Sequence, residues 1–274
     1  MSDLPLLIEP EQLHAAQPND NLLIIDQSTA DTFIKHHIPG AVHLDFKRLQ
    51  LGQAPTPGAL PDIEQLSAVF SELGLTPETH VVASDDEGGG WAGRLIWALD
   101  MMGHTHYSYL NGGIHAWLDA GLPIESGAVA ATASNYTAQL IEHGPALSKQ
   151  EVIEQLGQAD FAIWDARSAL EYTGEKVNSA RGGHIPGAAN LDWLLLMDKD
   201  NALRLKPLAD IKATLANLGI DDTKHIVTHC QTHHRSGLTY LVGKLLGFNI
   251  KAYAGSWSEW GNDPNTPVTT GTEQ

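Results

Sequence analysis

The stretch that decides the fold is His37-Ile38-Pro39-Gly40-Ala41-Val42-His43-Leu44-Asp45, because the chain contains it twice. It recurs as His184-Ile185-Pro186-Gly187-Ala188-Ala189-Asn190-Leu191-Asp192, displaced by 184 − 37 = 147 residues, and seven of the nine positions are identical. An internal repeat of this kind indicates two copies of one domain. The proline and glycine of each copy predict a turn, with the glycine in a backbone conformation that other residues avoid. The motif therefore predicts structure more than chemistry.

Apolar runs and helical stretches surround the two copies in the same order. The matched apolar runs are 22–26 with 161–165 and 80–85 with 225–230, and the matched helical stretches are 92–102 with 236–246. Continuous apolar runs are typical of strands that are buried on both faces. Strands that alternate with helices predict an α/β fold with a mainly parallel sheet, flanked by helices, in each half.

A chain of 274 residues suits two domains of ordinary size. We expect an N-terminal domain over 1–126 and a C-terminal domain over 146–274. Residues 127–145 are rich in Ala, Ser and Thr and poor in large apolar side chains, so they predict a connector. The stretch from Asn262 onward is rich in Pro, Thr and Gly and predicts a surface tail.

The charge of the chain limits its partners. The formal net charge is −17, from 33 acidic and 16 basic residues with neutral histidines. This balance disfavours nucleic acid, because phosphate binding needs a basic surface. A small anionic substrate would need a local positive site against the field of the whole molecule. We expect no membrane segment, because no stretch approaches the ~18 apolar residues that a membrane helix requires.

A single cysteine, Cys230, excludes an intramolecular disulfide and fits a reducing compartment. The N-terminus has no basic region and only a short apolar run, so we expect no signal peptide and a cytoplasmic location. A monomer is expected, because two tandem domains can cover each other's faces.

The two halves differ most in the loop that follows the second matched strand. The first half continues Asp85-Asp86-Glu87-Gly88-Gly89-Gly90-Trp91, which begins with three acids and has no nucleophile. The second continues Cys230-Gln231-Thr232-His233-His234-Arg235-Ser236-Gly237. Cys230 thus lies between the end of a strand and the start of a helix. Loop N–H groups there can converge into an anion site, and the positive end of the helix points to the same place. Both effects, with the charge of Arg235, favour the thiolate over the thiol.

Three other interpretations compete with this one. A lone cysteine is most often a buried apolar residue, but the polar loop and its place at the carboxyl edge of a sheet favour a functional site. His229, His233 and His234 beside Cys230 could suggest zinc, but no second cysteine completes the usual set of four ligands. A cysteine phosphatase has five residues between Cys and Arg, whereas four separate Cys230 from Arg235.

On these residues the chain resembles the rhodaneses, in particular the tandem-domain thiosulfate sulfurtransferases of bacteria. The resemblance rests on the duplicated His-Ile-Pro-Gly-Ala motif, the paired strand-loop-helix segments and the six-residue loop from Cys230 to Arg235. It covers nearly the whole chain. It implies two rhodanese-like α/β domains, an inactive first domain with Asp85 in the cysteine position, and a catalytic second domain.

The resemblance also implies a mechanism. Cys230 would take a sulfur from thiosulfate to become a persulfide and pass it to a thiophilic acceptor such as cyanide, in a double displacement. The loop residues would stabilise the bound anion: Gln231, Thr232, His233, His234 and Arg235. No metal or organic cofactor is implied. A small anionic sulfur donor is the expected partner, and a protein sulfur acceptor is a possible second one.

Several positions depart from the family pattern. The residues after Cys230 match neither thiosulfate-preferring nor 3-mercaptopyruvate-preferring relatives, and Glu171 stands where relatives place an arginine. Arg181 could supply that missing charge as a substrate contact, since Arg suits oxyanion recognition. Arg167 is expected to be a structural ion-pair partner, and Trp193 is expected in the core or in the pocket wall. A 3-mercaptopyruvate sulfurtransferase and a persulfide carrier for a protein partner remain alternatives.

Overall fold

The computed structural model describes residues 4–273 and divides into two compact units. The first unit consists of Met1–Leu49, Pro61–Gly144 and Met197–Leu205. The second consists of Gln50–Leu60, Pro145–Leu196 and Lys206–Gln274. Each unit therefore includes one short segment from the other half of the sequence. The division drawn from the sequence, with domains over 1–126 and 146–274, stays a prediction.

The first unit is built on a parallel sheet with strand order β1-β5-β4-β2-β3. Its strands are β1 (Leu7–Ile8), β2 (Leu22–Asp26), β3 (Val42–His43), β4 (His80–Ser84) and β5 (Tyr107–Leu110). Its helices are α1 (Pro10–Ala16), α2 (Ala30–Lys35), η1 (Phe46–Leu49), α3 (Ile63–Glu72), α4 (Gly90–Met101) and α5 (Gly113–Asp119). The short antiparallel pair β8 (Met197–Asp198) and β9 (Arg204–Leu205) also belongs to this unit.

The second unit repeats this plan with strand order β11-β10-β6-β7, again all parallel. Its strands are β6 (Phe161–Asp165), β7 (Ala188–Asn190), β10 (His225–His229) and β11 (Asn249–Ala252). Its helices are α6 (Lys149–Gln155), α7 (Ala169–Thr173), η2 (Trp193–Leu195), α8 (Leu208–Asn217), α9 (Arg235–Leu245) and α10 (Ser256–Trp260). The α/β class, the duplication and the parallel sheets predicted from the sequence are confirmed.

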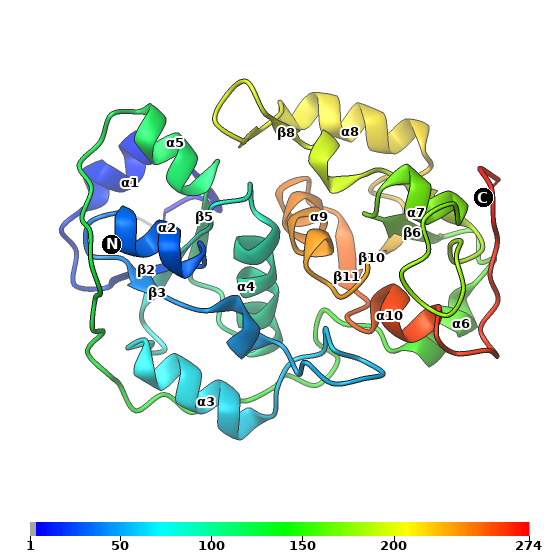
Figure 1. The fold of residues 1–274 in the computed structure, drawn as a ribbon, viewed down its shortest axis with the longest axis horizontal. Helices are drawn as coiled ribbons and strands as arrows, with labels where there is room; N and C mark the ends of the chain where they lie inside the picture. The colour runs from blue at the N-terminus through cyan, green and yellow to red at the C-terminus, as the bar shows by residue number, and fades with distance from the viewer. Residues whose placement is uncertain (1–3, 274) are drawn as a thin grey trace. The chain divides into compact units, whose positions relative to one another are not determined.

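Helices cover both faces of each sheet (Figure 1). In the second unit, Ile163 and Val227 of the central strands pack with Val152 of α6, Tyr172 of α7 and the tryptophans of α10. The opposite face is covered by α9, which contacts β10 and β11. Strands that are covered on both faces are rich in apolar residues, which explains the nearly continuous apolar runs of the sequence.

The repeated motif has the structural role expected of it. Gly40 and Gly187 have φ of +76° and +80°, the left-handed conformation that favours glycine. The histidine that opens each motif is fully buried. His184 stacks on Tyr172 at 3.7 Å between ring centroids, and its Nδ1 lies 2.8 Å from the carbonyl of Tyr172. The motif therefore fastens the turn before β7 to α7, as its first copy does at α2.

The predicted connector and the predicted C-terminal tail both form backbone contacts with the units. In the connector, the N–H of Ser134 donates to the carbonyl of Ser71 at 2.8 Å, so this stretch lies along α3 of the first unit. In the C-terminal tail, Thr269 forms an antiparallel bridge with His184. The tail therefore lies at the surface, as expected, and is held there against the second motif. No helix within residues 4–273 has the length and apolar character needed to cross a bilayer.

Candidate active site

Cys230 is the first residue after β10 and precedes α9 by a short loop. β10 is a central strand, paired with β6 on one side and β11 on the other, so its carboxyl end is fixed from both sides. The helix that begins at Arg235 points its positive end toward the same loop. This is the edge at which ligands gather in open α/β sheets.

The sulfur of Cys230 is buried, but its neighbours are polar. The residue is 0% exposed. The hydroxyl of Ser236 donates to Sγ across 3.4 Å. Burial raises the pKa of the thiol, but Arg235, hydrogen bonds from the side chain and backbone of Ser236, and His234 together lower it below its ordinary value. The arrangement favours an ionised sulfur.

Ser256 fastens the cysteine loop to the start of α10. Its Oγ accepts the N–H of Cys230 at 3.3 Å and the N–H of His233 at 3.2 Å, and donates to the carbonyl of Tyr253 at 2.9 Å. Both Ser256 and His233 have positive φ, +53° and +52°, which is uncommon for residues with a side chain. Backbone strain of this kind often marks functional sites.

Arg235 is held by Glu171 in a two-pronged ion pair. Its two terminal nitrogens donate to the carboxylate of Glu171 at 2.6 and 2.9 Å. The Glu171 side chain is 3% exposed and that of Arg235 is 18% exposed. Burial opposes ionisation, but the bonds from Arg235 and Ser168 lower the pKa of Glu171 to about 2. Glu171 is also the N3 residue of a capping box with Ser168, so α7 positions it.

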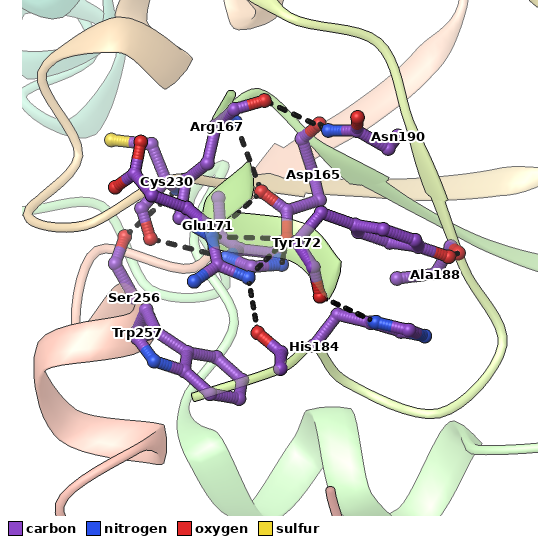
Figure 2. A network of polar contacts seen from close by, with 12 residues as sticks. Asp165, Arg167, Glu171, Tyr172, His184, Ala188, Asn190, Cys230, Ser256 and Trp257 are labelled. Atoms are coloured by element: carbon purple, nitrogen blue, oxygen red, sulfur yellow. Dashed lines mark hydrogen bonds and ion pairs between the residues drawn. The ribbon is translucent and has the colours of Figure 1, made fainter. Parts of the chain in front are cut away.

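A second buried ion pair, between Asp165 and Arg167, lies at the carboxyl end of β6 (Figure 2). Both side chains are nearly inaccessible, with 0% and 2% exposed. Arg167 also donates to the carbonyl of Gly183 and lies over the ring of Trp257 at 4.4 Å. Burial opposes ionisation, but Arg167 and His229 lower the pKa of Asp165, whereas burial lowers the pKa of His229. The structural role expected of Arg167 is confirmed.

The corresponding loop of the first unit holds a carboxylate in place of the sulfur. Asp85 follows β4 and is fully buried. Its two oxygens accept the N–H groups of Glu87, Gly88, Gly89, Trp91 and Ala92 at distances from 2.9 to 3.2 Å. This loop is therefore an anion-binding nest that its own side chain fills.

The structure places the other predicted loop residues as follows. The side-chain amide of Gln231 donates to Ser179 Oγ at 3.1 Å. The carbonyl of Thr232 faces Gly58 of the segment Gln50–Leu60. His234 lies edge-on to Trp193, with ring centroids 5.5 Å apart, and Trp193 is 9% exposed. Their roles toward a substrate stay predictions.

Arg181 binds backbone carbonyls. Its guanidinium donates to the carbonyls of Trp260 at 3.0 Å and Thr266 at 2.8 Å, and also contacts Asp263 and the Thr266 hydroxyl. These bonds close the end of α10 and the turn that follows it. The geometry thus favours a structural role, and substrate contact stays an untested prediction.

Sequence reasoning did not assign a role at the site to Ser236 or Ser256, and treated Glu171 only as a departure. A signal for the serines was present, since aligning the halves places Ser236 opposite Trp91 and Ser256 opposite Gly113. For Glu171 the signal was the capping box with Ser168. Within residues 4–273, no cluster of three His, Cys, Asp or Glu side chains could hold a metal ion.

The chain is similar to proteins of known family along its whole length. Residues 9–120 and 148–263 each match the family model of the rhodanese-like domain. The chain is 52% identical to the thiosulfate sulfurtransferase of Azotobacter vinelandii, over 97% of this chain and 98% of that protein. It is 49% identical, with the same coverage, to the thiosulfate sulfurtransferase of Pseudomonas aeruginosa. A solved complex of EanB with ergothioneine covalently linked to a persulfide cysteine has a TM-score of 0.87 and 25% identity, over 98% of this chain and 71% of that chain.

Proposed function

The chain belongs to the rhodanese family and is a sulfurtransferase, and from this premise we propose that it moves the outer sulfur of thiosulfate to a thiophilic acceptor through a persulfide on Cys230. The observation that carries the proposal is the polar environment of the chain's one cysteine, whose sulfur accepts the hydroxyl of Ser236 and faces the charge of Arg235. The names of the two relatives that align over nearly the full length support thiosulfate as the donor. The persulfide cysteine of the EanB complex supports the intermediate.

The first half-reaction forms the persulfide. The Cys230 thiolate attacks the outer sulfur of thiosulfate, a bond forms between the two sulfurs, and the S–S bond of the donor breaks. Sulfite leaves with the electron pair of that bond. The product is a persulfide anion on Cys230, and no external oxidant or reductant takes part.

The second half-reaction restores the enzyme. A nucleophile such as cyanide attacks the outer sulfur of the persulfide and leaves as thiocyanate, and Cys230 returns as a thiolate. The chain's own part is to hold negative charge on sulfur in both states. The hydroxyl of Ser236, the charge of Arg235 and the N-terminus of α9 act in that direction.

Intact mass measurement tests the intermediate directly. We expect thiosulfate treatment to add the mass of one sulfur atom, and cyanide to remove it again. The chain has one cysteine, so the added atom has one expected position. A mass that does not change, in protein shown to be folded, would contradict the proposal.

Replacement of the nucleophile is the first functional prediction. Cys230→Ser is expected to abolish both the mass gain and thiocyanate formation, because a serine hydroxyl remains protonated where the thiol ionises. Thermal unfolding should change little, since the two side chains are nearly the same size. Retained sulfur transfer in this variant would show that Cys230 is not the carrier.

The intact mass measurement, combined with an assay of thiocyanate formation, also separates the alternative functions from the main proposal. A stable persulfide with poor turnover on cyanide would favour a sulfur carrier for a protein partner. Faster persulfide formation with 3-mercaptopyruvate than with thiosulfate would favour that donor instead.

A further inference from the structure

A continuous series of hydrogen bonds joins Cys230 to His233 through Ser236. Ser236 Oγ lies 3.4 Å from Cys230 Sγ and 2.7 Å from Nδ1 of His233. All three residues are 0% exposed, so water does not compete for these bonds. The N–H of His233 is fixed by Ser256, which also fixes the N–H of Cys230. The imidazole is thus held at the far end of a relay that begins at the sulfur.

The first unit provides an internal comparison. Position by position, its loop has Gly88 where the second has His233, and Trp91 where the second has Ser236. Both Gly88 and His233 have positive φ, +91° and +52°, so the backbone follows a related course. Glycine suits this conformation, whereas an imidazole there is strained. The hydroxyl and the imidazole therefore occur only in the loop that carries the cysteine.

The protonation state of the sulfur decides in which direction the hydrogen bonds from Cys230 to His233 point. The Ser236 hydroxyl has one hydrogen, so it can donate either to Sγ or to Nδ1, but not to both. If the sulfur is a thiolate, the hydroxyl donates to Sγ and Nδ1 must carry a proton to donate to Oγ. If the sulfur is a thiol, its hydrogen points to Oγ, the hydroxyl donates to Nδ1, and that nitrogen is bare.

We propose that His233 accepts the thiol proton of Cys230 through the hydroxyl of Ser236, so that the two residues hold the sulfur in its reactive ionised form. In this step the S–H bond breaks as an O–H bond forms on Ser236, and the original O–H bond breaks as an N–H bond forms at Nδ1. One proton leaves the sulfur, one arrives at the imidazole, and no electrons are exchanged. The proposal rests on Cys230 as the sulfur carrier and adds positioning residues for it.

The other charged groups around Cys230 do not replace this relay. Arg235 and His234 face the sulfur from the start of α9, but Arg235 is shared with the carboxylate of Glu171. At the carboxyl end of β6, the negative charge of Asp165 is neutralised by its ion pair with Arg167. Burial lowers the pKa of His229, which favours its neutral form. Ser236 bonds to the sulfur and also links it to a group that can take a proton.

The test is an ultraviolet titration of the Cys230 thiolate, with Cys230→Ser protein as the blank. Ser236→Ala removes the hydroxyl. His233→Gly removes the imidazole and installs the residue that the first unit has at this position. Ser258→Ala is the matched control, because it removes a buried hydroxyl of the same unit that donates to the carbonyl of Gly255 at 2.9 Å. Circular dichroism checks that each variant is folded.

We expect the titration midpoint to rise by about one pH unit in Ser236→Ala and in His233→Gly, since a hydrogen bond to a charged group has about this effect. The Ser258→Ala midpoint should equal that of the parent. The double variant should shift no further than Ser236→Ala, because His233 acts through the hydroxyl. An unshifted midpoint in either single variant, or shifts that add in the double variant, would overturn the proposal. The titration reads ionisation without sulfur transfer, so its outcome is separate from that of the mass experiment.

Discussion

At the scale of single residues, the pair Glu171 and Arg235 sets the charge beside the sulfur. Arg235 donates both terminal nitrogens to Glu171 and faces Cys230 as well. A carboxylate that holds an arginine in this way fixes its direction and offsets part of its charge. The acid that looked like a departure from the family pattern therefore has a defined partner in the structure.

Replacement of this carboxylate should destabilise the protein in a pH-dependent way. Glu171→Gln keeps the capping-box geometry with Ser168 but leaves Arg235 without its counter-charge, at a cost of about 3 kcal/mol in the free energy of unfolding near neutral pH. The pKa of Glu171 lies at about 2, below its ordinary value of 4.5, so the pair stabilises the fold above pH 4.5. That contribution should fade as the pH falls from 4.5 through 2.

Chemical denaturation at several pH values measures this difference. Glu151→Gln is the matched control, because Glu151 has the same capping-box position in α6 and its contacts lie at the surface. A Glu171→Gln protein that is as stable as this control at neutral pH would contradict the role of the pair.

Arg181 gives the second prediction at this scale. Arg181→Gln should lower the melting temperature by several degrees, because it removes several donors to carbonyls at the end of α10. The KM for thiosulfate should be unchanged, because these donors serve the backbone. A large rise in KM with little change in melting temperature would instead support the substrate contact that the sequence suggested.

At the scale of elements, the two copies differ most in the loop that connects the central strand to the next helix. In the first unit, β4 and α4 enclose five N–H groups that converge on Asp85. In the second, β10 and α9 enclose a sulfur, and Ser256 takes two of the loop's N–H groups. Gly113, opposite Ser256, has no room for a side chain, because its Cβ would lie 2.1 Å from the carbonyl of Asp85. The same strand-loop-helix arrangement thus encloses a carboxylate in the first unit and a cysteine sulfur in the second.

Asp85→Ala tests the carboxylate-filled loop. Buried N–H groups would lose their acceptor, and leaving such groups unpaired costs about 1–3 kcal/mol each before relaxation and water entry reduce it. We expect a lower melting temperature, with sulfur transfer by the remaining folded protein changed little, because the proposed nucleophile, Cys230, lies in the second unit. A large loss of turnover in folded Asp85→Ala protein would show that the first unit takes part in the reaction.

At the scale of the whole molecule, each unit is completed by a segment from the other half of the chain. Residues Gln50–Leu60 belong to the second unit and Met197–Leu205 to the first. Gly58 in the former segment is buried against the cysteine loop. A Cβ there would lie 2.2 Å from the carbonyl of Thr232 and 2.7 Å from that of Ala254. The first half of the sequence thus contributes to the wall of the site.

Gly58→Ala should therefore disturb the site from a distance in sequence. The added methyl group must displace backbone, so we expect a loss of about 1–3 kcal/mol in stability and a lower rate of persulfide formation. Gln53→Ala, in an exposed part of the same segment, is the control. Equal rates in Gly58→Ala and the control would show that this segment does not shape the site.

The sequence by itself determined the duplication, the α/β class, the strands ending at Asp26 and Asp165, and the cysteine between strand and helix. Periodicity, glycine positions and loop length are local properties that the order of residues carries directly. Only the tertiary structure decided the partners of Glu171 and Arg181, the chain from Cys230 through Ser236 to His233, and the exchange of segments between the units. These depend on which residues far apart in sequence meet in space, because burial and geometry, and not sequence spacing, set which polar groups must pair.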